Sequence, residues 1–235
     1  MNEKTYEQPC LNEAWFVTGT DTEVGKTVVS SALLEAATLR GKDTVGYKPV
    51  ASGSEWREGK LRNTDALALQ DASSISVSYE EVNPYTFEEP TSPHIISADE
   101  NRPIEFEVMS QGLLALRKKS NWTLVEGAGG WFTPLSETTS FAQWVVREQL
   151  PVILVVGVKL GCINHALLTA QAVAQSGLRL GGWVANCVVE PGKRHAEYMA
   201  TLRRLLPAPC LGEIPHIPHA DAKALAAYLD LSSLN

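Results

Sequence analysis

Residues 18–27, TGTDTEVGKT, contain the residue types that bind phosphate. They follow an apolar run and precede a helical pattern, so they predict a turn between a buried strand and a helix. In such a turn, backbone N–H groups and the positive end of the helix dipole converge on an anion. Lys26 can reach the β- and γ-phosphates, and the Thr27 hydroxyl can hold Mg²⁺. Five residues separate Gly19 from Gly25, one more than in the usual pattern, so this variant P-loop predicts a nucleoside triphosphate site.

One lysine and two acidic residues outside the P-loop are candidates to complete the site. Lys48 interrupts the apolar run of residues 44–50. A buried ammonium group is costly unless it meets an anion. Lys48 therefore either contacts an anion or extends its charged end to the surface. Asp65 lies in the first turn of an expected helix, as a metal ligand or as a carboxylate favoured by the helix dipole. Glu126 ends another apolar run, where P-loop enzymes place a Mg²⁺ ligand. The small residues after it, which let backbone approach a phosphate closely, are Gly127, Ala128, Gly129 and Gly130.

Two later strand ends also carry polar residues. Residues 161–164 lead into a helix, and a helix N-terminus can bind a carboxylate, although Asn164 is equally suited to be a plain helix cap. Asn186 ends the next expected strand, and its amide offers both a donor and an acceptor to an adenine edge. The histidines give no metal-binding pattern, since His216 and His219 lie in a loop with prolines around them.

Strand and helix patterns alternate along the chain, which predicts an α/β fold with a mostly parallel central sheet and helices on both faces. Ligands of such a sheet collect at the carboxyl ends of its strands. Every candidate above lies at one of these ends or within a few residues of it. The expected strands are residues 14–18, 44–50, 122–126, 151–157, 182–186 and 210–214. The expected helices are residues 26–39, 64–70, 107–119, 141–148, 164–176, 193–205 and 221–229. Residues 73–103 are expected to form an ordered excursion over the active face.

Composition limits the class of protein. The 235 residues are 44% hydrophobic and 20% charged, which suits one α/β domain over residues 14–235 after an extension at residues 1–13. A net charge of −7 argues against nucleic acid as a partner. The longest strongly apolar run, residues 150–158, is too short to span a membrane. Residues 1–13 do not form a signal peptide, and four widely spaced cysteines suit reduced thiols, so the expected location is the cytoplasm.

Seven segments in the same order resemble the dethiobiotin synthetase family, and a match of this kind is far more specific than any one motif. The resemblance covers the chain from residue 15 to about residue 217. The segments are residues 19–27 (GTDTEVGKT), 46–55 (GYKPVASGSE), 63–70 (NTDALALQ), 82–98 (VNPYTFEEPTSPHIISA), 125–135 (VEGAGGWFTPL), 160–171 and 182–186 (GWVAN).

The resemblance implies a ligase that uses Mg·ATP and CO₂ on the vicinal diamine 7,8-diaminononanoate (7,8-diaminopelargonate). One amine takes up CO₂ as a carbamate, the carbamate attacks the γ-phosphate to give a carbamic–phosphoric anhydride, and the second amine closes the ureido ring. Carbamate and γ-phosphate are neighbouring anions that repel one another. The reaction therefore needs cations around both, and Lys26 and Lys48 suit that role as catalytic residues.

The resemblance also assigns binding roles. Magnesium would be held by Thr27, Asp65 and Glu126, and substrate would be contacted by Ser52. The residues expected to bind ATP are Glu23, Val24, Gly25, Lys26, Thr27, Asp65, Glu126, Gly127, Ala128 and Gly129. Those expected at the adenine are Asn186, Cys187, Pro215, His216 and Ile217. His216 and Ile217 differ from the residues that the family pattern has at these positions. Members are homodimers, and the residues of the partner subunit expected to receive the substrate carboxylate are Gly161, Cys162, Ile163, Asn164 and Tyr198.

Three other classes of P-loop protein are alternatives. Nucleotide-driven switches that partition DNA or position cell-division machinery usually carry an extra lysine beside the first glycine of the loop, and residues 19–22 contain none. Amide-forming ligases of corrinoid precursors normally add a glutamine-hydrolysing domain, for which this chain has no room. A paralogue that acts on another diamine or amine is the alternative that the sequence excludes least well.

Overall fold

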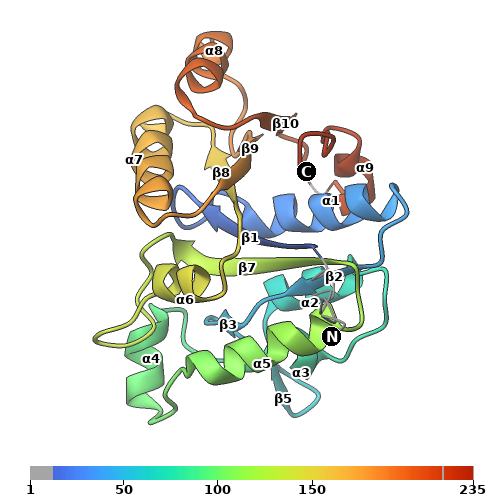
Figure 1. Cartoon of the computed structure of the whole chain (residues 1–235), viewed down its shortest axis with the longest axis vertical. Helices are drawn as coiled ribbons and strands as arrows, with labels where there is room; N and C mark the ends of the chain where they lie inside the picture. The colour runs from blue at the N-terminus through green and yellow to red at the C-terminus, as the bar shows by residue number, and fades with distance from the viewer. Residues whose placement is uncertain (1–12, 219, 235) are drawn as a thin grey trace, which may run out of the picture.

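The computed structural model describes residues 13–218 and 220–234. Its central sheet has six strands in the order β10-β9-β8-β1-β7-β2, and all neighbouring strands are parallel (Figure 1). The strands are β1 (Glu13–Gly19), β2 (Thr44–Tyr47), β7 (Trp122–Gly130), β8 (Val152–Gly157), β9 (Leu180–Asn186) and β10 (Cys210–Ile214). The predicted α/β class with a parallel sheet is therefore confirmed.

Both faces of the sheet are covered by helices, because successive strand residues point to opposite faces. Trp15 and Val17 of β1 lie in a buried cluster with α1 (Lys26–Thr38), α2 (Thr64–Asp71), α3 (Tyr79–Val82) and α9 (Ala222–Ala226). Ala14 and Phe16 point to the other side, where the buried residues come from α5 (Phe106–Arg117) and α6 (Phe141–Arg147). On that side α7 (Cys162–Gln175) and α8 (His195–Leu205) pack over β8 and β9. The strands are thus buried on both faces, as their continuous apolar runs predict.

The connection between β2 and β7 departs most from the sequence prediction. The single strand expected at residues 44–50 is wrong: β2 ends at Tyr47, and the Lys48 N–H donates instead to the Val82 carbonyl at 2.8 Å. Pro49 follows, and proline has no N–H to continue a ladder. The chain then enters a parallel pair, β3 (Val50–Ala51) with β6 (Tyr85–Thr86), and an antiparallel hairpin, β4 (Glu55–Arg57) with β5 (Lys60–Arg62).

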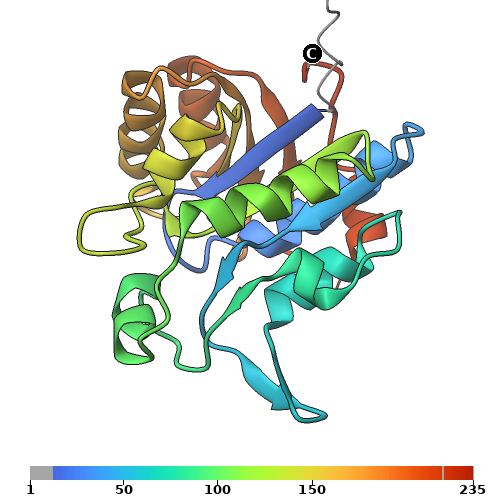
Figure 2. The same ribbon diagram turned by 60° about the horizontal axis from the view of Figure 1, so that its bottom comes forward.

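The excursion expected at residues 73–103 is ordered and contains α3, β6 and α4 (Pro93–Asp99). Figure 2 shows the β4–β5 hairpin and α4 projecting on the same side of the molecule. Ser52 Oγ donates to the Thr91 carbonyl at 2.8 Å, and Gly53 N–H donates to the Glu89 carbonyl at 3.1 Å. These bonds fix the loop after β3 against the excursion.

The start of α7 also differs from expectation. The helix begins at Cys162 and is preceded by Gly161, whose φ of 94° lies in the left-handed region. Asn164 is consequently inside the first turn, and the alternative that it caps the helix is wrong. Apart from Glu13, the expected N-terminal extension lies outside the described residues, as does His219. Within the part of the chain that the structure describes, no helix is long and apolar enough to cross a membrane.

Close packing of α2 on β2 yields a stability prediction. A Cβ on Gly46 would lie 2.7 Å from Leu69 Cβ and 3.1 Å from Leu34 Cδ1, so α2 can approach the strand only over a glycine. We expect Gly46→Ala to lower the free energy of unfolding by about 1–3 kcal/mol, because the added methyl group overpacks the contact. Urea denaturation measures this change. Gly192→Ala is the matched control, since a Cβ there meets no described atom within 4 Å; equal midpoints for the two variants would contradict the prediction.

Candidate active site

The chain between β1 and α1 forms the predicted phosphate-binding loop. Gly25 has a φ of 81°, and a Cβ there would lie 2.1 Å from Asn186 Nδ2, so both conformation and space require glycine. Lys26 begins α1, whose first N–H groups have no partner within the helix. Lys26 Nζ donates to the Asp21 carbonyl at 3.1 Å, which folds the ammonium back over the loop. A cation and free N–H groups therefore face the same loop.

Four predicted residues from separate segments meet beside this loop. Lys48 Nζ donates to Glu126 Oε1 at 2.6 Å, to Asp65 Oδ2 at 3.3 Å and to the Gly127 carbonyl at 3.1 Å. Thr27 Oγ1 donates to the same Glu126 oxygen at 2.8 Å. Glu126 is fully buried and Lys48 is 3% exposed, so the alternative that Lys48 extends to the surface is wrong. The strand lysine meets anions, as the first alternative requires.

The cluster sets the protonation of its members. Burial alone would lower the pKa of Lys48, but the Glu126 and Asp65 carboxylates outweigh it and raise that pKa. Burial would raise the pKa of Asp65, but Lys48 and a hydrogen bond from Thr27 outweigh it and lower that pKa. For Lys26 the balance is the opposite: burial, and then repulsion from Lys48, outweigh the carboxylates of Glu126, Asp65 and Asp21 and lower its pKa to about 8. Lys48 is therefore firmly charged at neutral pH, whereas Lys26 is close to losing its proton.

A cavity of about 370 Å³ opens between the loop and the cluster, which is enough for part of a nucleotide or a small substrate. Most of its lining was predicted from the sequence. The predicted residues that line it are Glu23, Gly25, Lys26, Thr27, Lys48, Ser52, Asp65, Ala128 and Gly129. Val24 and Gly127 contribute backbone carbonyls to neighbouring hydrogen bonds.

Asn63 lines the same cavity and was missed. Its Oδ1 accepts from the N–H groups of Asp65 and Ala66, and its Nδ2 donates to the Ser52 carbonyl at 3.2 Å. Asn63 therefore caps α2 and ties the loop at Ser52 to the helix that carries Asp65. An asparagine directly before a helical pattern is a cap signal that would have found it.

The ends of β9 and β10 are joined to the loop. Asn186 Nδ2 donates to the Val24 carbonyl at 2.9 Å, so one N–H of this amide holds the phosphate loop, and the second N–H and Oδ1 remain for the predicted contact with adenine. Cys187 N–H donates to the Ile214 carbonyl at 2.9 Å, and its own carbonyl lies 3.2 Å from His216 Nδ1. The residues expected at the adenine, which also include Pro215 and the exposed Ile217, thus share one edge next to the P-loop.

The residues expected at the substrate carboxylate lie elsewhere. Among the described residues that line the P-loop cavity, none belongs to the start of α7 or to α8. Tyr198 lines a different cavity of about 330 Å³, together with Lys159 and Leu160 just before α7. Cys162 is 3% exposed, so its side chain is closed to substrate. The structure therefore places the Gly161–Asn164 turn and Tyr198 near one another but outside the P-loop cavity of the same chain.

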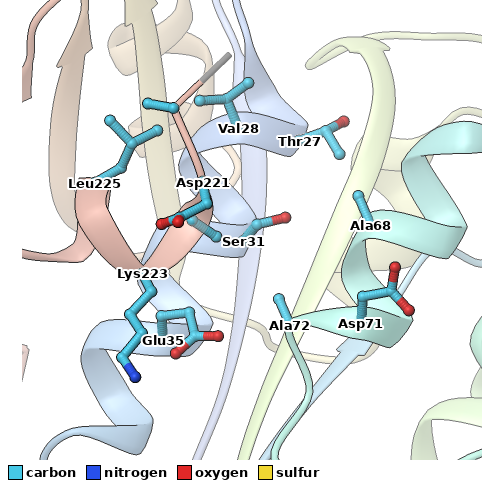
Figure 3. A pocket seen from close by; sticks show the side chains of 12 residues that line it. Thr27, Val28, Ser31, Glu35, Ala68, Asp71, Ala72, Asp221, Lys223 and Leu225 are labelled. Atoms are coloured by element: carbon cyan, nitrogen blue, oxygen red, sulfur yellow. The ribbon is translucent and has the colours of Figure 1, made fainter. Parts of the chain in front are cut away.

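A further cavity of about 360 Å³ adjoins the site between α1, α2 and α9 and shares Thr27 and Val28 with it (Figure 3). Figure 3 shows carboxylates around this space, from Glu35, Asp71 and Asp221, with Lys223 beside them. An acidic lining repels phosphate. The triphosphate is accordingly expected in the cavity with Lys26 and Lys48.

The lowered pKa of Lys26 gives a second prediction. Below about pH 8 the folded protein holds a buried charge that the unfolded chain solvates, so Lys26→Met should stabilise the nucleotide-free protein at pH 7 by about 1–3 kcal/mol. From about pH 8 to 10.5 the folded state has released this proton and the unfolded state has not, so the stability of the parent rises relative to the variant. Urea denaturation across this range measures the difference. The exposed Lys60→Met is the control, and a Lys26→Met protein less stable than the parent at pH 7 would refute the prediction.

Comparisons with known proteins agree with this geometry. The AAA domain family matches residues 13–224. The chain is 66% identical over 225 residues to the ATP-dependent dethiobiotin synthetase BioD of Pseudescherichia vulneris. The matched residues make up 95% of this chain and 94% of that protein. It is 65% identical over 225 residues to the ATP-dependent dethiobiotin synthetase BioD 1 of Escherichia coli (strain K12), covering 95% of this chain and all of that protein.

Solved structures with the same fold are more distant in sequence. MinD in the MinC:MinD cell division protein complex of Aquifex aeolicus superposes with a TM-score of 0.57 at 16% identity, over 90% of this chain and 85% of that chain. A ParA family ATPase from Chlorobium tepidum TLS gives 0.54 at 11% identity, over 95% of each chain. At these identities the likeness establishes the P-loop fold alone. Near-full-length identity to the synthetases establishes the family, and the chain belongs to the ATP-dependent dethiobiotin synthetases.

Proposed function

We propose that this protein is an ATP-dependent dethiobiotin synthetase that acts on 7,8-diaminononanoate (7,8-diaminopelargonate) with CO₂ and ATP, in biotin biosynthesis. The observation that carries the proposal is the buried Lys48 ammonium, held by Glu126 and Asp65 beside a P-loop whose own lysine faces the same cavity. Two cations at one cavity suit a reaction that brings two anions together. Here the second cation comes from the end of β2, whereas residues 19–22 of the P-loop contain no lysine.

The reaction has three bond-making steps. One substrate amine forms an N–C bond to CO₂ and loses a proton to solvent, giving a carbamate. A carbamate oxygen then bonds to the γ-phosphorus as the bond to ADP breaks, and the product is a mixed anhydride. The second amine attacks the anhydride carbonyl, phosphate leaves with the bonding pair, and the proton of that amine passes to solvent. The ring closes without any oxidant or reductant.

Lys48 and Lys26 have distinct tasks in these steps. The raised pKa of Lys48 keeps a fixed positive charge beside the carbamate, while Lys26, at the start of α1, faces the phosphate. Fixed donors aimed at developing charge are usually the largest single contribution to catalysis. A bound triphosphate would raise the pKa of Lys26 again, because an anion favours the charged amine.

Magnesium fits the oxygen atoms beside Lys48. Glu126 Oε2 is buried without a hydrogen-bond partner among the described residues, and such an oxygen is costly unless a ligand satisfies it. We propose that Thr27, Asp65 and Glu126 hold the ion, an all-oxygen set of the kind that Mg²⁺ prefers. An ion held there would neutralise charge on the phosphates. The Pyrococcus horikoshii MinD, which shares the fold with a TM-score of 0.57, is complexed with Mg-ADP.

We further propose a cytoplasmic homodimer. Leu160, beside the α7 turn, and Leu168 within α7 are exposed apolar side chains, 88% and 58% respectively, and suit burial by a second copy. A partner could bring Tyr198 and the α7 turn to the P-loop cavity that lacks them in a single chain. A cytoplasmic location suits an enzyme that consumes ATP, and Cys162, Cys187 and Cys210 are free thiols.

The proposed function is tested by incubating purified protein with 7,8-diaminononanoate, bicarbonate, ATP and Mg²⁺. We expect mass spectrometry to detect dethiobiotin in equal amount to ADP, and only when all four components are present. ADP formed without dethiobiotin would overturn the substrate assignment and favour another amine. If neither ADP nor dethiobiotin formed, the proposal that the protein is this enzyme would be overturned.

Lys48 is the residue whose replacement tests the mechanism. Lys48→Ala would leave the buried Glu126 carboxylate unpaired, at a cost of about 3–5 kcal/mol in folding, so Lys48→Gln is the sharper variant because glutamine still donates hydrogen bonds. We expect its kcat to fall by about 10²–10³, with ATP affinity little changed. The exposed Lys60→Gln is the control. Equal losses of ATP affinity and turnover in Lys48→Gln would show that Lys48 binds nucleotide and does not act in catalysis.

A shared site predicts complementation between inactive chains. If each site takes Lys48 from one subunit and Tyr198 from the other, a mixed dimer of Lys48→Gln and Tyr198→Phe chains contains one intact site. At low substrate concentration, unfolding and refolding the two inactive proteins together should restore about a quarter of the parent activity by random pairing. Mixing without subunit exchange is the control. No recovery, in dimers shown to be mixed by mass, would place both residues in one chain's site.

A further inference from the structure

A cluster of three metal-binding side chain types lies outside the cavity that the proposed reaction uses. Cys187 follows β9, His195 begins α8 and Glu213 belongs to β10, and Figure 1 shows these three elements grouped together. One ligand atom from each residue lies within 4.8 Å of the other two. His195 Nε2 and Glu213 Oε1 are 2.6 Å apart. Three separate segments thus bring sulfur, nitrogen and oxygen donors to one point.

The donor set and its burial suit zinc. Cys187 is 4% exposed, and His195 and Glu213 are half-buried. Zn²⁺ accepts thiolate, imidazole and carboxylate ligands, and three protein ligands leave one position for water. A thiol is a poor ligand for Mg²⁺ or Ca²⁺, which prefer oxygen. His195 also lines the cavity of about 330 Å³ that contains Tyr198, which gives solvent a route to the cluster.

The alternative is an ion pair of His195 and Glu213 with a buried thiol beside it. The orientation of the Glu213 carboxylate favours a cation instead. Arg203 Nη2 lies 3.4 Å from Glu213 Oε2, which orients the carboxylate and leaves Oε1 toward His195. A partner that orients a ligand in this way is typical of metal sites.

We propose that Cys187 Sγ, His195 and Glu213 bind one Zn²⁺ ion per chain, with water in the fourth position. Coordination requires the thiolate, and the thiol proton passes to solvent. The ion would join the ends of β9 and β10 to the start of α8. Cys187 already contacts Ile214 and His216 through its backbone, so the same ion would stiffen the edge proposed to hold adenine.

Cobalt absorption tests the ligand set directly. We expect chelator-treated full-length protein to bind one Co²⁺ per chain with a thiolate-to-cobalt charge-transfer band, and Zn²⁺ to displace it. Cys187→Ser should abolish the band, and His195→Ala and Glu213→Gln should each weaken Co²⁺ binding by more than about tenfold, since even residues that only support ligands cost this much. Cys210→Ser, Cys162→Ser and Cys10→Ser are matched controls that should retain it. A band that survives Cys187→Ser, or equal affinity in His195→Ala, would overturn the site.

Thermal unfolding provides a readout independent of ligase activity. Because Zn²⁺ would bind the folded chain in preference to the unfolded one, it should raise Tm in a concentration-dependent way. The shift should persist in Cys210→Ser and be clearly smaller in His195→Ala at the same Zn²⁺ concentration, a variant whose folding is checked by circular dichroism without metal. A Zn²⁺ shift of the same size in both variants would refute the proposal, whatever the protein does with ATP.

Discussion

The active site depends on the contact between two buried charges, Lys48 and Glu126. Neither could be buried alone, because an unpaired ion in the interior costs several kcal/mol. The contact requires β7 to lie between β1 and β2, which is the strand order observed. This order places the P-loop, the carboxylate and the second lysine at the ends of three adjacent strands. The sheet topology thus brings together three groups that lie far apart in the sequence.

The same arrangement explains why the site opposes folding. Lys26 lies close to Lys48, and its pKa falls to about 8 because burial and a like charge disfavour the ammonium. Glu126 Oε2 is buried without a partner among the described residues. Both features are unfavourable in the nucleotide-free protein and would become favourable if phosphate and the proposed divalent cation bound there. Side chains arranged to bind charged ligands in this way lower the stability of the ligand-free folded protein, a common cost of functional sites.

The sequence predicts most of this architecture because local patterns determine it. Residues 210–214 are a strand with the predicted bounds, and the P-loop, Lys48, Asp65 and Glu126 converge as their strand-end positions require. The features that the sequence does not reveal are contacts between residues that lie far apart along the chain. The chain leaves the main sheet at Lys48 because Val82, distant in sequence, accepts its N–H. Asn186 faces the carbonyl of Val24, 162 residues away, and no local pattern reveals that partner.

The segment between β2 and β7 supplies much of the cavity beside the phosphate loop. MinD and ParA family proteins superpose on the chain at 11–16% identity, so the sheet and the phosphate loop do not by themselves specify an activity. The chain from Lys48 to Asp65 supplies five residues of the 370 Å³ cavity, namely Lys48, Ala51, Ser52, Asn63 and Asp65. Asn63 connects Ser52 to the helix that carries Asp65, and Asp65 pairs with Lys48. Ser52, Asn63, Asp65 and Lys48 are therefore joined by hydrogen bonds, so a shift of the loop at Ser52 would be transmitted to the Lys48–Asp65 ion pair.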